Sequence, residues 1–312
     1  MKTQGLQMAS ACAIALTLTA CGGGGSDSHV NSTPPPVPPP PSGSASVVIF
    51  PNPTPQTYTS VGASAAGTFF DTGSLGSVSS SDADQPHIRY TTAGYYEIQL
   101  PGKDWDGLIP HKGYLPPSEN VFQPASSNNY FVIEQAKDKG YLYSELASWS
   151  DDAQRYGTVA FGSSTLPGQV PQTGSATYQG IVGGSSDVVN SNSFDGNYRV
   201  SVAGSVDLNF NFGQGTLAGA ITLILDDYSP DTIGTFAFKD TVFSVGSASY
   251  SGKFDTSATG QNYFLGQFTG PNAEETIGAW ALPFIFTTGS STLTPDGKAH
   301  QAFGAWIAKK GP

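Results

Sequence analysis

The feature that most constrains the fold is a two-residue alternation of apolar and polar side chains in the second half of the chain. In residues 205–227, SVDLNFNFGQGTLAGAITLILDD, this alternation continues on both sides of a Gly-Gln-Gly turn. Successive side chains of a strand point to opposite faces, so the pattern predicts a β-hairpin with one apolar face. Almost no segment of the chain has the 3.6-residue period of an amphipathic helix, and we expect an all-β fold.

Several other short segments of the same region are also strand-like, each bounded by Gly, Asp, Asn, Ser or Pro. They are ATYQGIVGG, NYRVSVAG, TFAFKDTVFSV, ASYSGKFDT, QNYFLGQFTG, GAWALPFIFTT and AFGAWIAKK. With the hairpin they give about eight strands in roughly 140 residues, the number at which an antiparallel sheet can close around its own side chains. We therefore predict an antiparallel β-barrel of about eight strands over residues 166–312. Alternation alone leaves open which parity faces the interior.

The region before the barrel has a different texture. HIRYTTAGYYEIQLP, NYFVIEQA and GYLYSELASWSD are strand-like, but long loops separate them. We predict a smaller, irregular β-rich domain over residues 46–165. The Pro- and Gly-rich stretch LPGQVPQTGSA is the expected join to the barrel.

The N-terminus is typical of an exported lipoprotein. One lysine precedes an apolar stretch too short to span a bilayer, and small residues lead to Cys21 in Leu-Thr-Ala-Cys. This pattern predicts a signal peptide over residues 1–20 and a lipid anchor on the Cys21 sulfur. Gly22, rather than an aspartate, follows the cysteine and favours the outer membrane. Residues 21–45, rich in Gly and Pro, are expected to form a tether.

Charge and cysteine content exclude several kinds of partner and site. The chain has 13 basic and 24 acidic residues, and removal of residues 1–20 takes away Lys2, leaving a mature charge of about −12. A nucleic-acid partner is therefore not expected. The only other cysteine, Cys12, lies in the predicted signal peptide, so the exported chain would have no thiol for a disulfide or a thiolate metal site.

Two adjacent glutamates in the stretch GQFTGPNAEETIGAWALPF raise the question of an acid/base pair. Neighbours in sequence point in different directions, whereas an acid/base pair must converge on a substrate. Asn272 and Glu275 instead have the spacing of a capping box on one helical turn. We therefore interpret Asn272 and Glu275 as structural turn residues.

The same stretch resembles the barrel signature of transferrin-binding protein B-like surface lipoproteins, in which a strand ends in a Gly-Pro-Asn-Ala-Glu-Glu turn. GTVAFGSSTLPGQVPQTGSATYQGIVGG resembles the start of that family's barrel, and AFGAWIAKK resembles its closing strand. The resemblance covers residues 157–310 and implies a surface-exposed unit of one barrel and one handle domain. It implies binding of a ligand, in known members a host iron protein, haemoglobin or a complement regulator. Transferrin-binding protein B itself carries two such lobes, and this chain has room for one.

No pattern of residues in the chain indicates an enzyme. The four histidines are scattered, and His-Glu-x-x-His, Gly-x-Ser-x-Gly and P-loop motifs are absent. The carboxylate pairs at 151–152 and 226–227 fit no EF-hand loop and are interpreted as turn or strand-end residues. We expect neither a cofactor nor a metal site.

One long loop is the best candidate for a partner contact. The stretch KDWDGLIPHKGYLPP presents Trp105, His111 and Tyr114 among Gly and Pro residues. Aromatic side chains on loops are typical interface anchors. The alternative is that Trp105 packs into the smaller domain as a satellite core residue.

Four functions remain open on the sequence. The first is a non-enzymatic ligand-binding module, for a protein, haem or metal-chelate ligand, beside an outer-membrane transporter. The second is a structural or adhesive surface lipoprotein without a nutrient ligand. The third is an integral membrane barrel, which the lipobox and the Lys-Lys-Gly-Pro ending disfavour. The fourth, a hydrolase using Asp104, Asp106 and Glu119, rests only on the abundance of acidic residues.

Overall fold

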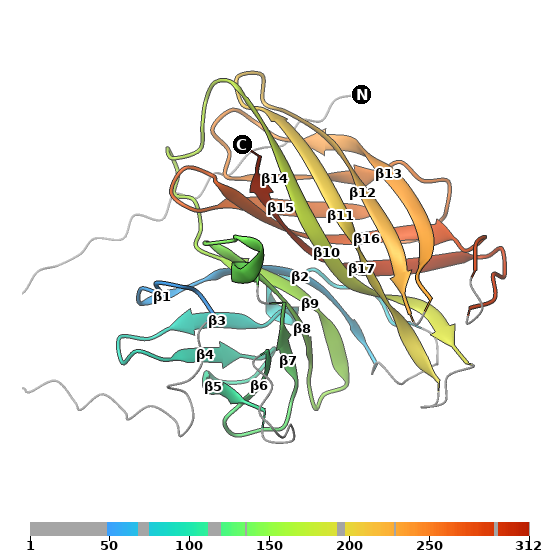
Figure 1. Ribbon diagram of the computed structural model, residues 1–312, viewed down its shortest axis with the longest axis horizontal. Coiled ribbons are helices and arrows are strands. Elements are labelled where there is room, and N and C mark those ends of the chain that lie inside the picture. The colour runs from blue at the N-terminus through green and yellow to red at the C-terminus, as the bar shows by residue number, and fades with distance from the viewer. Residues whose placement is uncertain are drawn as a thin grey trace, which may run out of the picture. The chain divides into compact units, whose positions relative to one another are not determined.

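The computed structural model describes residues 49–67, 75–111, 120–134, 136–191, 197–227, 229–289 and 293–311. Within these ranges the chain forms a closed barrel and a nine-stranded sheet, both antiparallel (Figure 1). Two short 3₁₀ helices, η2 (Asp82–Asp84) and η3 (Ala136–Lys139), belong to the sheet region. No helix in the described ranges is long and apolar enough to cross a bilayer.

The barrel has the eight antiparallel strands predicted from the alternation. They are β10 (Ser175–Asn190), β11 (Tyr198–Asn211), β12 (Thr216–Asp226), β13 (Asp231–Val242), β14 (Ser249–Phe254), β15 (Tyr263–Thr269), β16 (Glu275–Ile285) and β17 (Ala299–Lys310). Each strand pairs with its neighbour in the chain, and β17 returns to pair with β10 from Tyr178↔Lys310 to Ser186↔Ala302. The predicted fold class is confirmed.

The apolar side chains of the alternating strands face the barrel interior. Val206, Leu208 and Phe210 of β11 are buried in the barrel core. Asp207 lies on the outer wall, where it accepts a hydrogen bond from Gln179 Nε2 at 2.9 Å. Side chains therefore fill the barrel, as expected for a barrel of this strand number.

One detail of the strand assignment was wrong. NYRVSVAG and the first half of the hairpin were expected as separate strands, but both lie in the single strand β11. Gly204 joins them without a break, and it is paired directly with Leu223 of β12. A Cβ atom at Gly204 would lie 2.0 Å from the Thr222 carbonyl oxygen, so glycine permits this close approach rather than marking a turn.

The sheet before the barrel is nearly closed on itself. Its strands, in chain order, are β1 (Gln56–Thr57), β2 (Thr59–Ala66), β3 (His87–Tyr90), β4 (Tyr96–Gln99), β5 (Asp106–Pro110), β6 (Val121–Pro124), β7 (Phe131–Ile133), β8 (Ser144–Ser150) and β9 (Arg155–Gly162). β1 pairs with β3, whereas β2, only one residue later in the chain, pairs with β9. One short segment thus joins the two edges around a core that includes Tyr58, Tyr96 and Phe161.

The sheet packs directly against the barrel wall. Leu146 and Ala160 of the sheet share a buried cluster with Ile277 and Ile307 of β16 and β17. The outer faces of these two barrel strands are consequently covered, and ten of the eleven residues of β16 are buried. This explains why GAWALPF is a continuous apolar run rather than an alternating one.

Candidate functional site

The predicted contact loop contributes strand β5 to the sheet. Trp105 immediately precedes β5 and is half-buried, whereas His111 immediately follows it and is buried. Tyr114 lies outside the described residues. The structure therefore places Trp105 and His111 at opposite ends of one short strand.

Trp105 lines a cleft of about 570 Å³ in the sheet. The other lining residues are Ile98, Leu100, Lys103, Asp104, Asp106, Pro124, Ser126, Ser127, Asn129 and Asp152. They come from β4, β5 and β6 and from three connecting segments, brought together by the pairing of β5 with both of its neighbours. The cleft therefore depends on strand pairing that the sequence alone does not display.

The indole of Trp105 is held in place from outside the cleft. The Arg89 guanidinium lies over the ring, with its Cζ atom 4.4 Å from the ring centroid. Arg89 Nε also donates to the Glu97 carboxylate across the β3–β4 pair. Trp105 is half-buried and is not a member of the sheet's core cluster.

The polar side of the cleft has one carboxylate that is hydrogen-bonded within the protein and two that face solvent. Asp106 accepts three hydrogen bonds, from Gly107 N at 2.8 Å, Ser126 N at 2.8 Å and Ser126 Oγ at 2.5 Å. Asp152 forms an ion pair with Lys103, 3.4 Å from Nζ to Oδ1, and both side chains are more than half exposed. Asp104 is exposed at the cleft. Asp106 therefore has a structural role, whereas Asp104 and Asp152 face solvent.

His111 does not line this cleft. Its ring is stacked on Tyr130, with centroids 4.4 Å apart and planes 16° apart, and its backbone N–H donates to the Val121 carbonyl. A buried, stacked imidazole is packed rather than presented to a partner. Of the two predicted contact residues within the described ranges, Trp105 lines the cleft and His111 does not.

The turn at residues 270–274 does not form the expected capping box. It contains no helical turn, and Asn272 N donates to the Glu274 carboxylate at 2.8 Å, not to Glu275. Glu275 begins β16 and accepts hydrogen bonds from Leu142 N at 2.6 Å and Tyr143 N at 3.1 Å. The assignment of Glu275 to the turn's cap is thus wrong, because unpaired backbone donors of the sheet take its carboxylate.

The two neighbouring glutamates therefore have different surroundings, and they do not converge on one site. Burial raises the pKa of Glu275, although hydrogen bonds from the segment 142–144 oppose the shift. The Glu274 carboxylate accepts hydrogen bonds within the exposed turn, from the backbone N–H and side-chain amide of Asn272.

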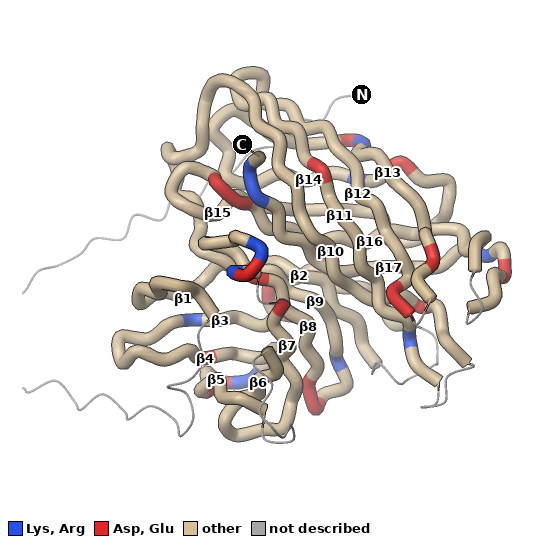
Figure 2. Tube along the Cα trace, in the orientation of Figure 1, with Lys and Arg blue, Asp and Glu red and all other residues tan. Residues whose placement is uncertain are grey.

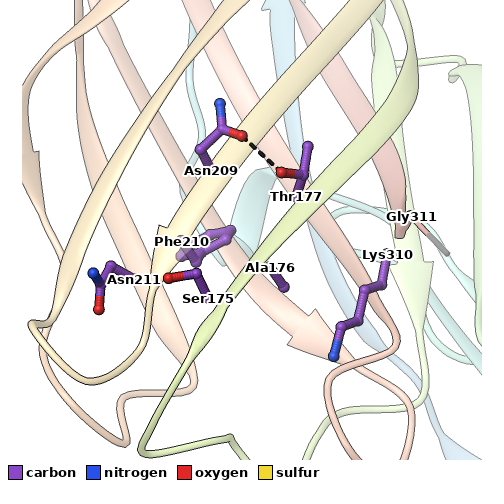
Figure 3. A pocket seen from close by; sticks show the side chains of 8 residues that line it. All are labelled: Ser175, Ala176, Thr177, Asn209, Phe210, Asn211, Lys310 and Gly311. Carbon is purple, nitrogen blue, oxygen red and sulfur yellow. Dashed lines mark hydrogen bonds between the residues drawn. The ribbon is translucent and has the colours of Figure 1, made fainter.

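A second cleft, of about 450 Å³, was not anticipated from the sequence (Figure 3). It lies on the barrel where β10 extends beyond the last β17 pair, and it is lined by Ser175, Ala176, Thr177, Asn209, Phe210, Asn211, Lys310 and Gly311. Thr177 Oγ1 donates to Asn209 Oδ1 at 2.9 Å. Figure 2 shows that charge is otherwise sparse along the barrel strands. This cleft offers short polar side chains and one lysine, but no exposed aromatic anchor.

Among the described residues, no group of three His, Cys, Asp or Glu side chains is arranged to hold a metal ion. Of the three acidic residues considered for hydrolysis, Asp106 accepts hydrogen bonds from Gly107 and Ser126. Glu119 lies outside the described residues.

Three solved structures to which this chain is similar are the following. The structure of a transferrin-binding protein B double mutant from Haemophilus parasuis Hp5 is 14% identical, covering 80% of this chain and 45% of that one, with a TM-score of 0.41. A transferrin-binding protein B mutant from Actinobacillus pleuropneumoniae H49 is 12% identical over 81% and 100%, with a TM-score of 0.44. The haemoglobin receptor HpuA from Kingella denitrificans is 12% identical over 85% and 90%, with a TM-score of 0.42.

The sequence match to a family is confined to the barrel. No protein of curated function has a significant sequence match to the chain. Residues 170–310 match the family model of the C-lobe and N-lobe β-barrels of Tf-binding protein B. These residues include all eight barrel strands. The barrel of this chain is thus similar to the β-barrels of transferrin-binding protein B.

Proposed function

We propose that this chain is a cell-surface lipoprotein that binds a ligand without chemical turnover. The observation that carries the proposal is the match of residues 170–310 to the barrels of a protein named for binding transferrin. The described residues form one barrel and one adjoining sheet, and we propose that they correspond to a single lobe. The proposed organisation is a signal peptide over residues 1–20, a tether over 21–45, a sheet domain over 46–165 and the barrel domain over 166–312.

The proposed ligand is an iron- or haem-related molecule or another host protein. Transferrin-binding protein B is named for transferrin, and HpuA is described as a haemoglobin receptor. For this chain we propose lipid anchoring through Cys21 in the outer membrane and a position beside an outer-membrane transporter. Exposure at the cell surface would give the sheet and barrel direct access to an extracellular protein.

Within this proposal, the cleft beside Trp105 is the contact site. Trp105 is half-buried, is oriented by Arg89 and lines a cleft large enough for a side chain of a partner. A pre-oriented aromatic side chain contributes contact area without losing much conformational entropy on binding. These properties favour Trp105 over His111 as the binding anchor.

The test uses the full-length protein displayed on cells grown with and without iron. Fluorescently labelled transferrin, haemoglobin and haem are offered to wild-type cells and to cells carrying Trp105→Ala. Val245→Ala is the matched control, because Val245 is a half-exposed apolar residue of the barrel that lines neither cleft.

Two results separate the candidate functions. Binding that falls at least tenfold in Trp105→Ala and persists in Val245→Ala supports a ligand-binding module with its site at the cleft. If surface display is normal and none of the three probes binds above the level of cells lacking the protein, the proposal fails for this ligand class. That result favours the structural or adhesive alternative.

A further inference from the structure

Acidic groups outnumber basic groups around the Trp105 cleft, and only some of the carboxylates are free to bind a partner. Three carboxylates, those of Asp104, Asp106 and Asp152, line it together with one ammonium, that of Lys103. Asp106 is satisfied by its hydrogen bonds with Gly107 and Ser126, so it does not need a further partner. The Lys103–Asp152 pair is 51% and 60% exposed, and such pairs are weak in water and exchange readily. A net negative charge therefore remains at the cleft.

The rest of the cleft lining mixes apolar and neutral polar residues. Ile98, Leu100 and Pro124 lie beside the Trp105 ring, and Ser126, Ser127 and Asn129 add polar groups. A long cationic side chain combines a methylene stem, which packs on apolar surface, with a charged head that remains near carboxylates or over an aromatic ring. An acidic side chain would meet like charge here, and an aliphatic one would leave the carboxylates without a partner.

The chain itself contains one example of this recognition at the same ring. The Arg89 guanidinium stacks on Trp105 at 4.4 Å and pairs with the carboxylate of Glu97. Arg89 does not line the cleft. The part of the Trp105 indole that faces the cleft can therefore contact a cationic group from a partner. The chain's formal charge of −11 would also steer a basic surface toward it.

We propose that the Trp105 cleft receives an arginine or lysine side chain from a basic surface of a partner protein. This inference rests on the proposed binding function and specifies the chemistry of its ligand. The ammonium or guanidinium group lies between the Trp105 ring and the carboxylates of Asp104 and Asp152. Its methylene groups lie along the half-buried Trp105 ring.

The tryptophans provide a direct readout of the cleft in the full-length protein. All four lie in the described ranges, and Trp149, Trp280 and Trp306 are at most 3% exposed. Collisional quenching of tryptophan fluorescence by ions in solution therefore reports mainly on Trp105. At matched ionic strength, the ratio of caesium to iodide quenching should be higher for the protein than for free N-acetyl-tryptophan amide, because the carboxylates attract the cation and repel the anion.

The binding experiment uses N-acetyl-arginine amide as the probe, with the neutral isostere N-acetyl-citrulline amide for comparison. We expect the arginine probe to protect Trp105 from acrylamide quenching and the citrulline probe to do so at least three times more weakly. The double variant Asp104→Asn/Asp152→Asn should reduce the protection by the arginine probe about threefold to tenfold, as expected for the loss of two exposed charges.

Asp255→Asn is the matched control for this variant. Asp255 is a 66% exposed carboxylate paired with Lys239 at 3.2 Å, like the Asp152–Lys103 pair, but it lies on the barrel away from the cleft. This control should leave both the caesium preference and the arginine protection unchanged.

A caesium-to-iodide quenching ratio no higher than that of free N-acetyl-tryptophan amide, or equal protection by arginine and citrulline, would overturn the inference. The proposed function is judged separately, by capture of a protein. If capture is lost in Trp105→Ala but unchanged in Asp104→Asn/Asp152→Asn, the binding function stands and the charge inference falls. If the cleft prefers the arginine probe while no protein is captured, the charge inference stands and the proposed function falls.

Discussion

Glu275 should be one of the most important single side chains for stability, although its neighbour Glu274 should matter little. The Glu275 side chain is 3% exposed and accepts hydrogen bonds from the backbone N–H groups of Leu142 and Tyr143. Replacement by alanine leaves two buried donors without an acceptor, each costing about 1–3 kcal/mol. We therefore expect Glu275→Ala to lower the free energy of unfolding by about 2–5 kcal/mol. Glu275→Gln keeps one carbonyl acceptor and should cost about half as much.

The matched control is Glu274→Ala. The Glu274 carboxylate accepts hydrogen bonds from Asn272 inside an exposed turn, so its loss should change the free energy of unfolding by less than about 1 kcal/mol. Urea denaturation followed by tryptophan fluorescence suits both variants, because Trp149 reports on the sheet, and Trp280 and Trp306 report on the barrel. If Glu275→Ala lies within 1 kcal/mol of Glu274→Ala, the Glu275 carboxylate does not hold the sheet to the barrel, and the reasoning is refuted.

Three further predictions concern buried groups. Burial raises the pKa of Glu145 to about 7. The free energy of unfolding should therefore fall by up to about 3 kcal/mol as the pH rises from about 4.5 to 7. In Glu145→Gln, the urea midpoint should change less with pH over this range. Hydrogen bonds to the carboxylates of Asp187 and Asp296 raise the pKa of His300. Protonated His300 therefore contributes stability that is fully present below about pH 6.5 and is lost as the pH rises through the folded-state pKa. If the urea midpoint of His300→Gln falls above pH 6.5 as much as that of the wild type, this prediction is contradicted. A Cβ at Gly278 would lie 2.3 Å from the Trp306 indole, so Gly278→Ala should lower the free energy of unfolding by about 1–3 kcal/mol, and an unchanged thermal midpoint would argue against the tight packing.

Most of the barrel could be predicted because its inner and outer surfaces follow local rules. The alternation in β11 and β12 places apolar side chains in the core and polar ones on the wall, and each turn contains residues that favour reversal of the chain. β16 departs from alternation because β2, β8 and β9 cover its outer face. The strands that cover β16 lie more than a hundred residues earlier in the chain. The only sign of this contact in the sequence of β16 is its unbroken apolar run.

The capping-box prediction at Glu275 failed for a related reason. Capping rules compare a carboxylate with the backbone donors of its own turn. Here the carboxylate meets the N–H groups of Leu142 and Tyr143, 133 and 132 residues earlier in the chain. A local pattern predicts a local partner correctly only when no distant donor competes. Glu274, which has no such competitor among the described residues, does bond within the turn.

The candidate site was located in part from the sequence, and its chemistry depended on the structure. Trp105 was identified because aromatic residues in loops are typical anchors, but Arg89, Ile98, Pro124 and Asp152 reach it through strand pairing. Because these groups come from hydrogen-bonded strands and their short connections, the cleft is formed before a ligand arrives. A preformed cleft requires little ordering of side chains on binding, so the affinity should depend mainly on the match in charge and shape. Exchange of carboxylates for amides at the cleft is therefore expected to weaken binding without altering the fold.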